Sequence, residues 1–182
     1  CRFDGLHRFQ CERIILIMPT WREWIADEDD RLKMYEGTTN IPKTNYFISW
    51  SNFICDMRIK DISQKYKFYI IFFPHRNMQK YMEYFPTSND YIEVADAKKY
   101  DVQGLLKRAS MMITDYSSVF FDYANLKRPM LFYTYDLDKY RDVLRCFYID
   151  METELPGPLV YTTEEVIDKI KNLNSLNQEY QQ

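Results

Sequence analysis

The sequence predicts an α/β fold, with one Rossmann-like parallel sheet flanked by helices. Short apolar runs rich in β-branched residues alternate with segments whose apolar residues recur at helical spacing. This alternation is typical of right-handed βαβ units and therefore of a parallel sheet. The 182 residues correspond to one domain at roughly 150 residues per domain. We expect a lead-in over 1–13 and a single domain over 14–182.

Five apolar runs are expected to form the strands. The first, 14–18, reads IILIM and stops at Pro19, as a strand buried on both faces would. The other expected strands are 67–73, 91–94, 111–114 and 130–133. All are far shorter than the ~20 apolar residues that a membrane-spanning helix needs.

The expected helices lie between and after these runs. They are the segments 50–66, 78–85, 102–109, 117–126, 135–144 and 163–173. The last segment has Thr162 or Thr163 as its cap and two glutamates in its first turn, which favours a helix start. The polar stretch 22–45, with its acidic cluster at 27–30, is expected to form a long loop or short helices over the surface.

Composition excludes several classes of function. Lys and Arg total 24 against 27 Asp and Glu, a net charge of -3, whereas a general nucleic-acid binder carries a basic excess. The four glycines lie too far apart for a dinucleotide fingerprint or a Walker-type phosphate loop. The four cysteines contain no CxxC pair, and we interpret them as reduced thiols of a cytosolic protein.

The chain ends carry little positive information. No signal peptide is visible. The chain opens with Cys1 rather than Met, so we expect it to be a piece excised from a longer protein.

Polar residues follow the expected strands, and in open α/β sheets ligands bind beyond the carboxyl ends of the strands. Thr20 and Arg22 follow the first strand, and His75 follows the second. The segment 115–118 follows the fourth strand, and a pair of aspartates follows the fifth. Basic groups and hydroxyls are therefore expected to meet on one rim.

The segment 114–118 joins a strand directly to a helix. Unpaired amides and a partial positive charge at a helix start bind phosphate, and Ser117 and Ser118 would add hydroxyl donors. Asp122 lies four residues after Ser118 and shares its helix face, where it could accept ribose hydroxyls. The alternative is that Asp115 or Ser117 only caps the helix and that Asp122 is solvated.

His75 and two arginines are further candidates. An imidazole at a strand's carboxyl end could donate to a phosphate oxygen and stabilise a leaving diphosphate, although a lone histidine is more often structural. Arg22 and Arg128 could pair with phosphate in forked geometry, although each is more often a surface residue. Asp136 and Asp138 have DxD spacing, which in some sugar-nucleotide transferases holds a metal; the pattern is short and common.

One longer motif is specific. Residues 114–122 read TDYSSVFFD and, with KRP at 127–129 and FY at 132–133, resemble the CDP-glycerol glycerophosphotransferase family of teichoic-acid and capsular-polymer enzymes. The stretches MPTWR (18–22), FPH (73–75), YDLDKYRD (135–142), FYID (147–150) and ELPGP (154–158) agree in order. The resemblance runs from about residue 14 to residue 160. Cys146 departs from it, since the family often has Gly there.

The resemblance implies a glycosyltransferase-B-type enzyme of two Rossmann-like halves, of which this chain is the C-terminal, donor-binding half. The enzyme would transfer a polyol phosphate, glycerol 3-phosphate first, from a CDP-activated donor to a polymer hydroxyl and release CMP. It implies no cofactor and no metal, which argues against the DxD reading. The implied catalytic residue is His75. The implied diphosphate ligands are Thr114, Asp115, Ser117, Ser118 and Arg22, and the implied ribose or nucleotide ligands are Asp122 and Arg128.

The resemblance also implies partners and a location. A lipid-linked polymer acceptor would bind through an N-terminal half that this chain lacks, so the isolated chain is expected to be inactive. The full-length protein would work in the cytoplasm, peripherally on the inner face of the cell membrane. Two alternatives stay open: a ribitol-phosphate or nucleotide-sugar transferase of similar fold, and a non-catalytic nucleotide-binding module.

Overall fold

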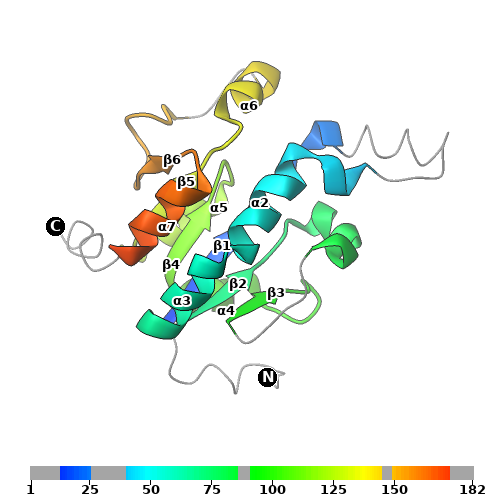
Figure 1. Cartoon of the computed structure of the whole chain (residues 1–182). Coiled ribbons are helices and arrows are strands. Elements are labelled where there is room, and N and C mark those ends of the chain that lie inside the picture. The colour runs from blue at the N-terminus through cyan, green and yellow to red at the C-terminus, as the bar shows by residue number, and fades with distance from the viewer. Residues whose placement is uncertain (1–12, 26–39, 86–90, 145–148, 173–182) are drawn as a thin grey trace.

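The computed structural model describes residues 13–25, 40–85, 91–144 and 149–172. Their centre is a six-stranded parallel sheet with the strand order β3-β2-β1-β4-β5-β6 (Figure 1). The strands are β1 (Arg13–Met18), β2 (Phe68–Phe72), β3 (Ile92–Val94), β4 (Ala109–Thr114), β5 (Met130–Tyr133) and β6 (Leu159–Val160). This order, with β1 in the middle and the chain turning back from β3 to β4, is that of the Rossmann fold.

The alternation of side chains along β1 builds two cores. Ile14 and Leu16 pack into the core on one face of the sheet, and Ile15 and Ile17 pack into the core on the other face. All four are almost completely buried. Because successive residues of a strand point to opposite faces, a continuous apolar run is what a strand covered on both sides requires.

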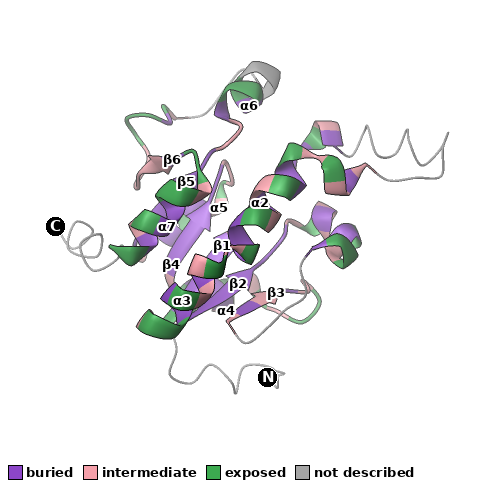
Figure 2. Ribbon diagram, viewed as in Figure 1, coloured by how far each residue is buried: buried purple, intermediate pink, exposed green. Residues whose placement is uncertain are grey.

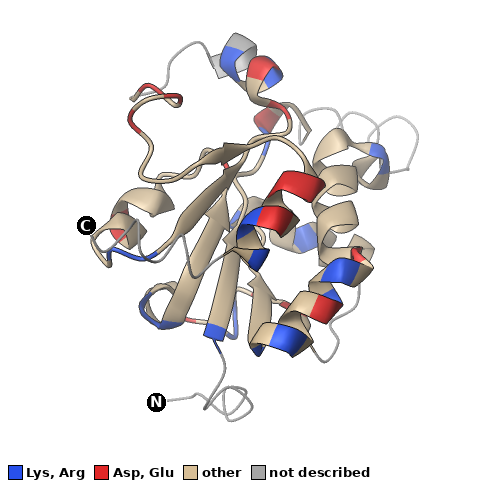
Figure 3. Cartoon of the chain, turned by 60° about the vertical axis from the view of Figure 1, so that its left-hand side comes forward, with Lys and Arg blue, Asp and Glu red and all other residues tan. Residues whose placement is uncertain are grey.

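Helices cover both faces of the sheet (Figures 1 and 2). One face carries α2 (Asn45–Cys55), α3 (Met57–Tyr66), α7 (Thr163–Lys171) and the 3-10 helix η3 (Arg76–Tyr84). The other face carries α4 (Val102–Arg108) and α5 (Val119–Ala124). The short helix η2 (Ile41–Lys43) precedes α2, and α6 (Leu137–Leu144) follows β5 at the carboxyl edge of the sheet. Charges lie on helices and loops, while the strands are mostly uncharged (Figure 3).

The expected α/β fold is confirmed, and the five expected strands are present with ends shifted by at most two residues. The sixth strand, β6, is missing from the sequence-based expectation because two residues give no periodic pattern. The helix expected over 78–85 is present as the 3-10 helix η3, which begins two residues earlier and ends at Tyr84. The acidic cluster 27–30 and three cysteines, Cys1, Cys11 and Cys146, lie outside the described residues, whereas Cys55 is an exposed thiol.

The expectation of one helix over 50–66 is wrong. The chain forms two helices, α2 and α3, separated by Asp56, whose backbone is extended. The Asp56 carboxylate accepts a hydrogen bond from the amide of Arg58 at 2.9 Å and so caps α3. Helix α2 begins earlier than expected, because the Thr44 hydroxyl accepts from the amide of Phe47 at 3.2 Å. Both are local capping interactions, and the one at Asp56 competes with a continuous helix.

No helix of the described ranges is both long enough and apolar enough to cross a membrane.

The cap of α3 can be tested by Asp56→Ala. Loss of a capping carboxylate costs about 1 kcal/mol of the free energy of unfolding. The hydrogen bond from Arg58 holds the pKa of Asp56 below its usual value. This stabilisation is therefore present at neutral pH and is lost as the pH falls through that lowered pKa. Urea unfolding at pH 7 and in acid should show the deficit shrinking in acid. Asp61→Ala, an exposed carboxylate within α3, is the control; equal losses for both variants would contradict the cap.

Candidate functional site

The candidate site lies at the carboxyl edge of the sheet, between β1 and β4. These two strands are neighbours at the point where the strand order reverses. The loops that follow β1 and β4 diverge to opposite faces there, which is where open α/β sheets bind ligands. The structure places the loops with Thr20, His75 and Ser117 around this point.

A buried ion pair joins the two loops. The guanidinium of Arg22 donates to Oδ2 of Asp115 at 2.9 Å, and both side chains have 0% exposure. The other oxygen of Asp115, Oδ1, accepts from the amides of Thr20 and Tyr116, each at 2.7 Å. Both oxygens of Asp115 therefore act as acceptors, as those of an ionised carboxylate do.

Asp136, after β5, completes the network. Nε of Arg22 donates to Oδ2 of Asp136 at 2.9 Å, and an η-nitrogen donates to Oδ1 at 3.0 Å, a two-pronged arrangement. The same guanidinium donates to the carbonyl of Thr20 at 2.7 Å. One arginine thus ties together the chain segments that follow β1, β4 and β5.

Four tyrosine rings surround this guanidinium. Its central carbon lies 4.9 to 5.8 Å from their centroids, within the range of cation–π attraction. The rings belong to Tyr46, Tyr116, Tyr135 and Tyr140. Tyr116 stacks on Tyr140 with centroids 3.7 Å apart and donates its hydroxyl to Oδ1 of Asp136 at 3.0 Å.

The electrostatics keep Arg22 charged and the tyrosines neutral. Burial alone lowers the pKa of Arg22, but the carboxylates of Asp115 and Asp136 outweigh it and raise the pKa above its usual value. Burial, reinforced by Asp136, raises the pKa of Tyr116 far above the ordinary range. The phenol groups therefore remain hydrogen-bond donors at any physiological pH.

These contacts assign Arg22, Asp115 and Thr114 to the framework of the site. The hydroxyl of Thr114 donates to the carbonyl of Met18 at 2.7 Å and fastens the end of β4 to the end of β1. Arg22 and Asp115 are completely buried and directed at each other. All three therefore hold the loop that carries Ser117 and Ser118 in place, and the direct diphosphate contacts that the sequence predicts for them stay a prediction.

The segment after Asp115 is open to solvent. Ser118 is exposed, Ser117 is partly exposed, and Asp122 lies exposed one turn further along α5. Ser118 occupies the cap position of α5 without a side-chain hydrogen bond to the helix, and Ser117 makes only a long contact of 3.5 Å with the amide of Val119. The hydroxyls are thus accessible to a ligand. Because α5 has only six residues, amides and hydroxyls contribute more here than a helix dipole.

His75 reaches the same rim from the end of β2. Its ring stacks on Trp21, with centroids 6.1 Å apart and planes 11° apart, and Trp21 directly follows Thr20. Nδ1 of His75 accepts from the amide of Asn77 at 3.2 Å. Burial and then the neighbouring charge of Arg76 lower the pKa of His75 below its usual value. The imidazole is therefore neutral near pH 7, with its proton on Nε2.

Arg128 lies away from the other candidate residues, and its expected role in nucleotide binding stays a prediction. Its guanidinium donates to the carbonyls of Lys107 and Ala109, both at 2.7 Å. Ala109 is the first residue of β4, so Arg128 stands at the amino edge of the sheet. The site is at the opposite, carboxyl edge, and Arg128 is therefore not brought together with His75 or Ser118.

The sequence alone missed the tyrosine cage, the pairing of Asp136 with Arg22 and the stacking of Trp21 on His75. The sequence did contain a signal for Trp21, because it lies between Thr20 and Arg22, which the sequence places after the first strand. The tyrosines gave no comparable signal, since 16 of them are spread over the chain. Within the described ranges, no cluster of three or more His, Cys, Asp or Glu side chains is arranged to hold a metal ion.

The strand order and the hydroxyl-rich loop at its switch point define a class: Rossmann-like α/β domains, a class in which ligands bind at this edge of the sheet. Within this class, residues 6–182 match the model of the CDP-Glycerol:Poly(glycerophosphate) glycerophosphotransferase family, and the chain belongs to that family.

Curated relatives and a solved structure that resemble this chain are teichoic acid polymerases. A teichoic acid poly(glycerol phosphate) polymerase of Bacillus spizizenii is 35% identical over 168 residues, which are 92% of this chain and 38% of the relative. One of Bacillus subtilis is 60% identical over 75 residues, 41% of this chain and 10% of the relative. The wall teichoic acid polymerase TagF superposes with a TM-score of 0.66 at 26% identity, covering 93% of this chain and 36% of TagF. The chain thus spans well under half the length of these relatives.

The framework role of Arg22 can be tested by Arg22→Met. This change leaves the Asp115 carboxylate buried without its partner, and breaking a buried pair in this way costs about 3–5 kcal/mol of the free energy of unfolding. Arg58→Met removes the exposed pairs of Arg58 with Asp56 and Glu164, and an exposed pair contributes about 0–1 kcal/mol. Urea unfolding of both variants checks the contrast. Losses of the same size would show that the Arg22 pair is not a framework element.

Proposed function

We propose that this chain holds the nucleotide donor of a polyol-phosphate transferase, with CDP-glycerol as the donor. The single observation that carries the proposal is the exposed Ser117–Ser118 loop at the switch point of the sheet, in a chain that belongs to the glycerophosphotransferase family. A TagF variant soaked with CDPG has the same fold, with a TM-score of 0.58 at 31% identity. A hydroxyl of the polymer acceptor would attack the β-phosphorus of the donor, and CMP would leave.

In this proposal the loop binds the diphosphate. The hydroxyls of Ser117 and Ser118 and the amides at the start of α5 donate to phosphate oxygens. Asp122, exposed on the next turn of α5, accepts hydrogen bonds from the ribose hydroxyls. Arg22 and Asp115 act only by fixing the position of the loop, and they make no contact with the donor.

His75 would act as a neutral hydrogen-bond donor. Since the amide of Asn77 occupies Nδ1, the neutral ring carries its proton on Nε2, the atom available to a ligand. A ring in this tautomer donates to a phosphate oxygen and stabilises the charge that develops on departing CMP. It is poorly suited to accept a proton from the attacking hydroxyl, because Nε2 is already protonated.

The remainder of the reaction belongs to a longer protein. We propose that the polymer acceptor and the base that activates its hydroxyl lie mainly on an N-terminal half, that the enzyme acts in the cytoplasm on the inner face of the membrane, and that the acceptor is lipid-linked. The partial coverage of the relatives supports a longer protein, since this chain matches only 38% of the Bacillus spizizenii polymerase and 36% of TagF. We expect no metal in the donor site, as the resemblance implies, and both oxygens of Asp136 already bind Arg22.

The role of His75 is tested by His75→Ala in the chain. A hydrogen bond to a charged group contributes roughly 1.5–3 kcal/mol, so affinity for CDP-glycerol at pH 7 should fall about tenfold or more. A bound diphosphate stabilises the protonated ring, so the pKa of His75 is higher in the complex than in the free protein. Native affinity should therefore rise as the pH falls below the pKa of His75 in the complex, and level off below its lowered pKa in the free protein.

The measurement is calorimetric titration between pH 5.5 and 8.5. The variant should lose the acid rise, since the diphosphate does not titrate in this range and the only other histidine is His7. The matched control is Lys107→Ala, which removes a cation in the last turn of α4, next to the amino end of β4. Its affinity for CDP-glycerol and the pH dependence of that affinity should match those of the native chain. An acid rise that survives in His75→Ala would remove His75 from the site.

Donor identity is tested by titrating the chain with CDP-glycerol, CDP-ribitol and a UDP-sugar, with and without Mn²⁺. We expect both CDP donors to bind in the absence of metal. Ser118→Ala should weaken the affinity for each of them about fivefold, the effect of one lost hydrogen bond. Tighter binding of CDP-ribitol would move the assignment to ribitol phosphate. Binding of the UDP-sugar only with Mn²⁺ would instead support Asp136 and Asp138 as a metal site. Absence of any nucleotide binding by the folded chain would contradict both the transferase and a nucleotide-binding module, and would favour a scaffold module without chemistry.

A further inference from the structure

The indole of Trp21 packs flat against the imidazole of His75. The ring centroids lie 6.1 Å apart and the planes differ by 11°, an offset parallel arrangement that aromatic rings favour. The two rings come from separate loops, since Trp21 follows β1 and His75 follows β2. Both side chains are partly exposed at the carboxyl edge, so the stack lies where a ligand of this edge would reach it.

The hydrogen bond of His75 does not set the plane of its ring. The amide of Asn77 donates to Nδ1 at 3.2 Å, which fixes one atom of the imidazole and leaves the plane free to tilt about that atom. The second side-chain torsion of histidine has broad, roughly twofold energy wells, so rotamer preference does not set the plane either. The flat contact with Trp21 supplies this restraint, because a tilted imidazole would lose the contact or overlap the indole.

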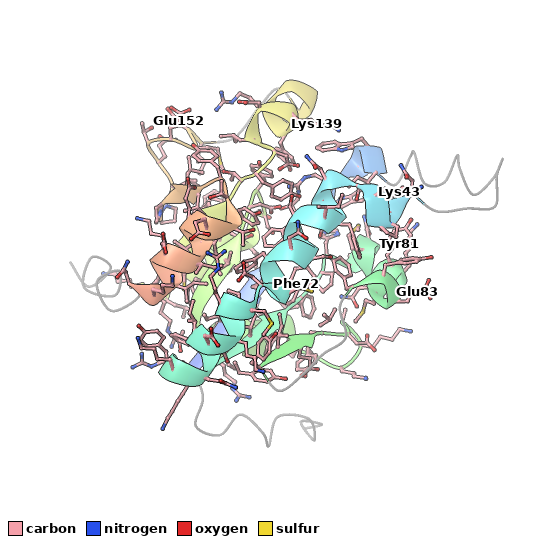
Figure 4. All side chains as sticks on the ribbon, in the orientation of Figure 1. Lys43, Phe72, Tyr81, Glu83, Lys139 and Glu152 are labelled. Carbon is pink, nitrogen blue, oxygen red and sulfur yellow. The ribbon has the colours of Figure 1, made fainter. Side chains whose placement is uncertain are left out.

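The backbone that carries His75 is fixed on both sides. Phe72 at the end of β2 and Tyr81 on η3 are buried, and Figure 4 shows Phe72 in the interior of the molecule and Tyr81 on η3. The amide of Phe73 donates to the carbonyl of Ile17 at 2.8 Å, so β1 and β2 stay joined up to the rim. The sheet therefore sets the distance between the two loops, and the plane of the imidazole remains to be fixed.

Trp21 is itself held by the buried network. The amide of Thr20, the residue before it, donates to Oδ1 of Asp115 at 2.7 Å. Arg22, the residue after it, forms the completely buried pair with the same carboxylate. The indole also packs against the core on the α2 face of the sheet. Trp21 is therefore a rigid support for the ring that stacks on it.

We propose that Trp21 is a positioning residue for His75 and holds the imidazole so that Nε2 faces the diphosphate of the donor. This role rests on the proposed function and deepens it, because it names the group that orients the proposed hydrogen-bond donor. A hydrogen bond weakens steeply once its angle at the hydrogen falls below about 120°, so the plane of the ring decides whether Nε2 can donate. The Arg22–Asp115 pair then positions two sets of donors, the serine loop directly and His75 through Trp21.

The first test compares Trp21→Leu with Trp21→Phe by calorimetric titration with CDP-glycerol at pH 7. Both replacements are apolar and smaller than Trp, but only Phe keeps a flat ring face. Leu should weaken the affinity about fivefold, the size of an aromatic pair's contribution, and Phe should stay within about twofold of native. Trp21→Met, also without a ring, is the second variant and should match Leu. Equal affinities of the Leu and Phe variants would overturn the proposal.

The second test is a double-mutant cycle with His75→Ala. A positioning residue acts only through its partner, so Trp21→Leu should cost about fivefold in the native chain and nothing further in His75→Ala. A purely structural role would weaken binding in both backgrounds. Losses that add in the double variant would therefore mean that Trp21 touches the donor itself or only holds the loop, and would overturn the proposal.

The third test is the pH profile of the affinity between pH 5.5 and 8.5. The acid rise comes from the protonated ring beside the diphosphate, so it should be smaller in Trp21→Leu than in the native chain. The charges that act on the imidazole are those of Arg76 on its own segment and Asp115 across the rim, and both remain in this variant. An acid rise of native size in Trp21→Leu would count against the positioning role and overturn it.

Trp24→Leu is the matched control. Trp24 is also a partly exposed indole of the segment after β1, but it packs edge-on against Tyr140, with centroids 6.1 Å apart and planes at 63°. Its replacement should leave both the affinity for CDP-glycerol and the acid rise as in the native chain. A loss equal to that of Trp21→Leu would reveal a general effect of removing an indole and would overturn the proposal.

The outcomes separate this role from the proposed function. If the native chain binds CDP-glycerol and the Leu and Phe variants bind it equally, the proposed function stands and only the role of Trp21 is overturned. If the native chain does not bind CDP-glycerol, the proposed function is overturned, and the role of Trp21 with it.

Discussion

The buried contact of Arg22 with Asp115 and Asp136 is the constraint on which the rest of the carboxyl edge depends. A guanidinium with 0% exposure is stable only when its charge is paired and its donors are used, and here two carboxylates and a backbone carbonyl meet that requirement. The three partners follow three different strands. Satisfying one buried charge therefore fixes the mutual positions of three loops that the sheet alone would leave independent.

That constraint explains how the loop after β4 is held in one conformation without glycine. Glycine-rich loops approach phosphate closely because they lack side chains, but their conformation must be fixed by other contacts. Here Asp115 accepts the amides of Thr20 and Tyr116 and so sets the backbone just before Ser117. Ser118, two residues further on, is exposed to solvent. At the same edge of the sheet, the ring of Trp21 stacks on the ring of His75. The two serines are at least partly exposed, whereas the charged framework beneath them is buried.

The candidate site could be predicted only in part, and the reason differs from residue to residue. Ser117, Ser118, Asp122 and His75 are placed by local rules, since each follows a strand end or a helix turn. Arg22 and Arg128 look alike in sequence, each close to a strand and each able to bind phosphate. Only packing separates them: Arg22 meets two carboxylates beneath the rim, and Arg128 binds carbonyls at the amino end of β4.

The sequence by itself determined the alternation of strands and helices, the two-faced burial of β1 and the family motif at 114–122. These are local periodicities and spacings, and a chain expresses them without reference to distant residues. The tertiary structure decided the break at Asp56, the two-residue strand β6, the tyrosine cage and the stacking of Trp21 on His75. Each of these depends on residues brought together from separate strands or helices, or on a capping bond that outcompetes a helical pattern. No local pattern in the chain encodes which of those competing contacts has the lower free energy.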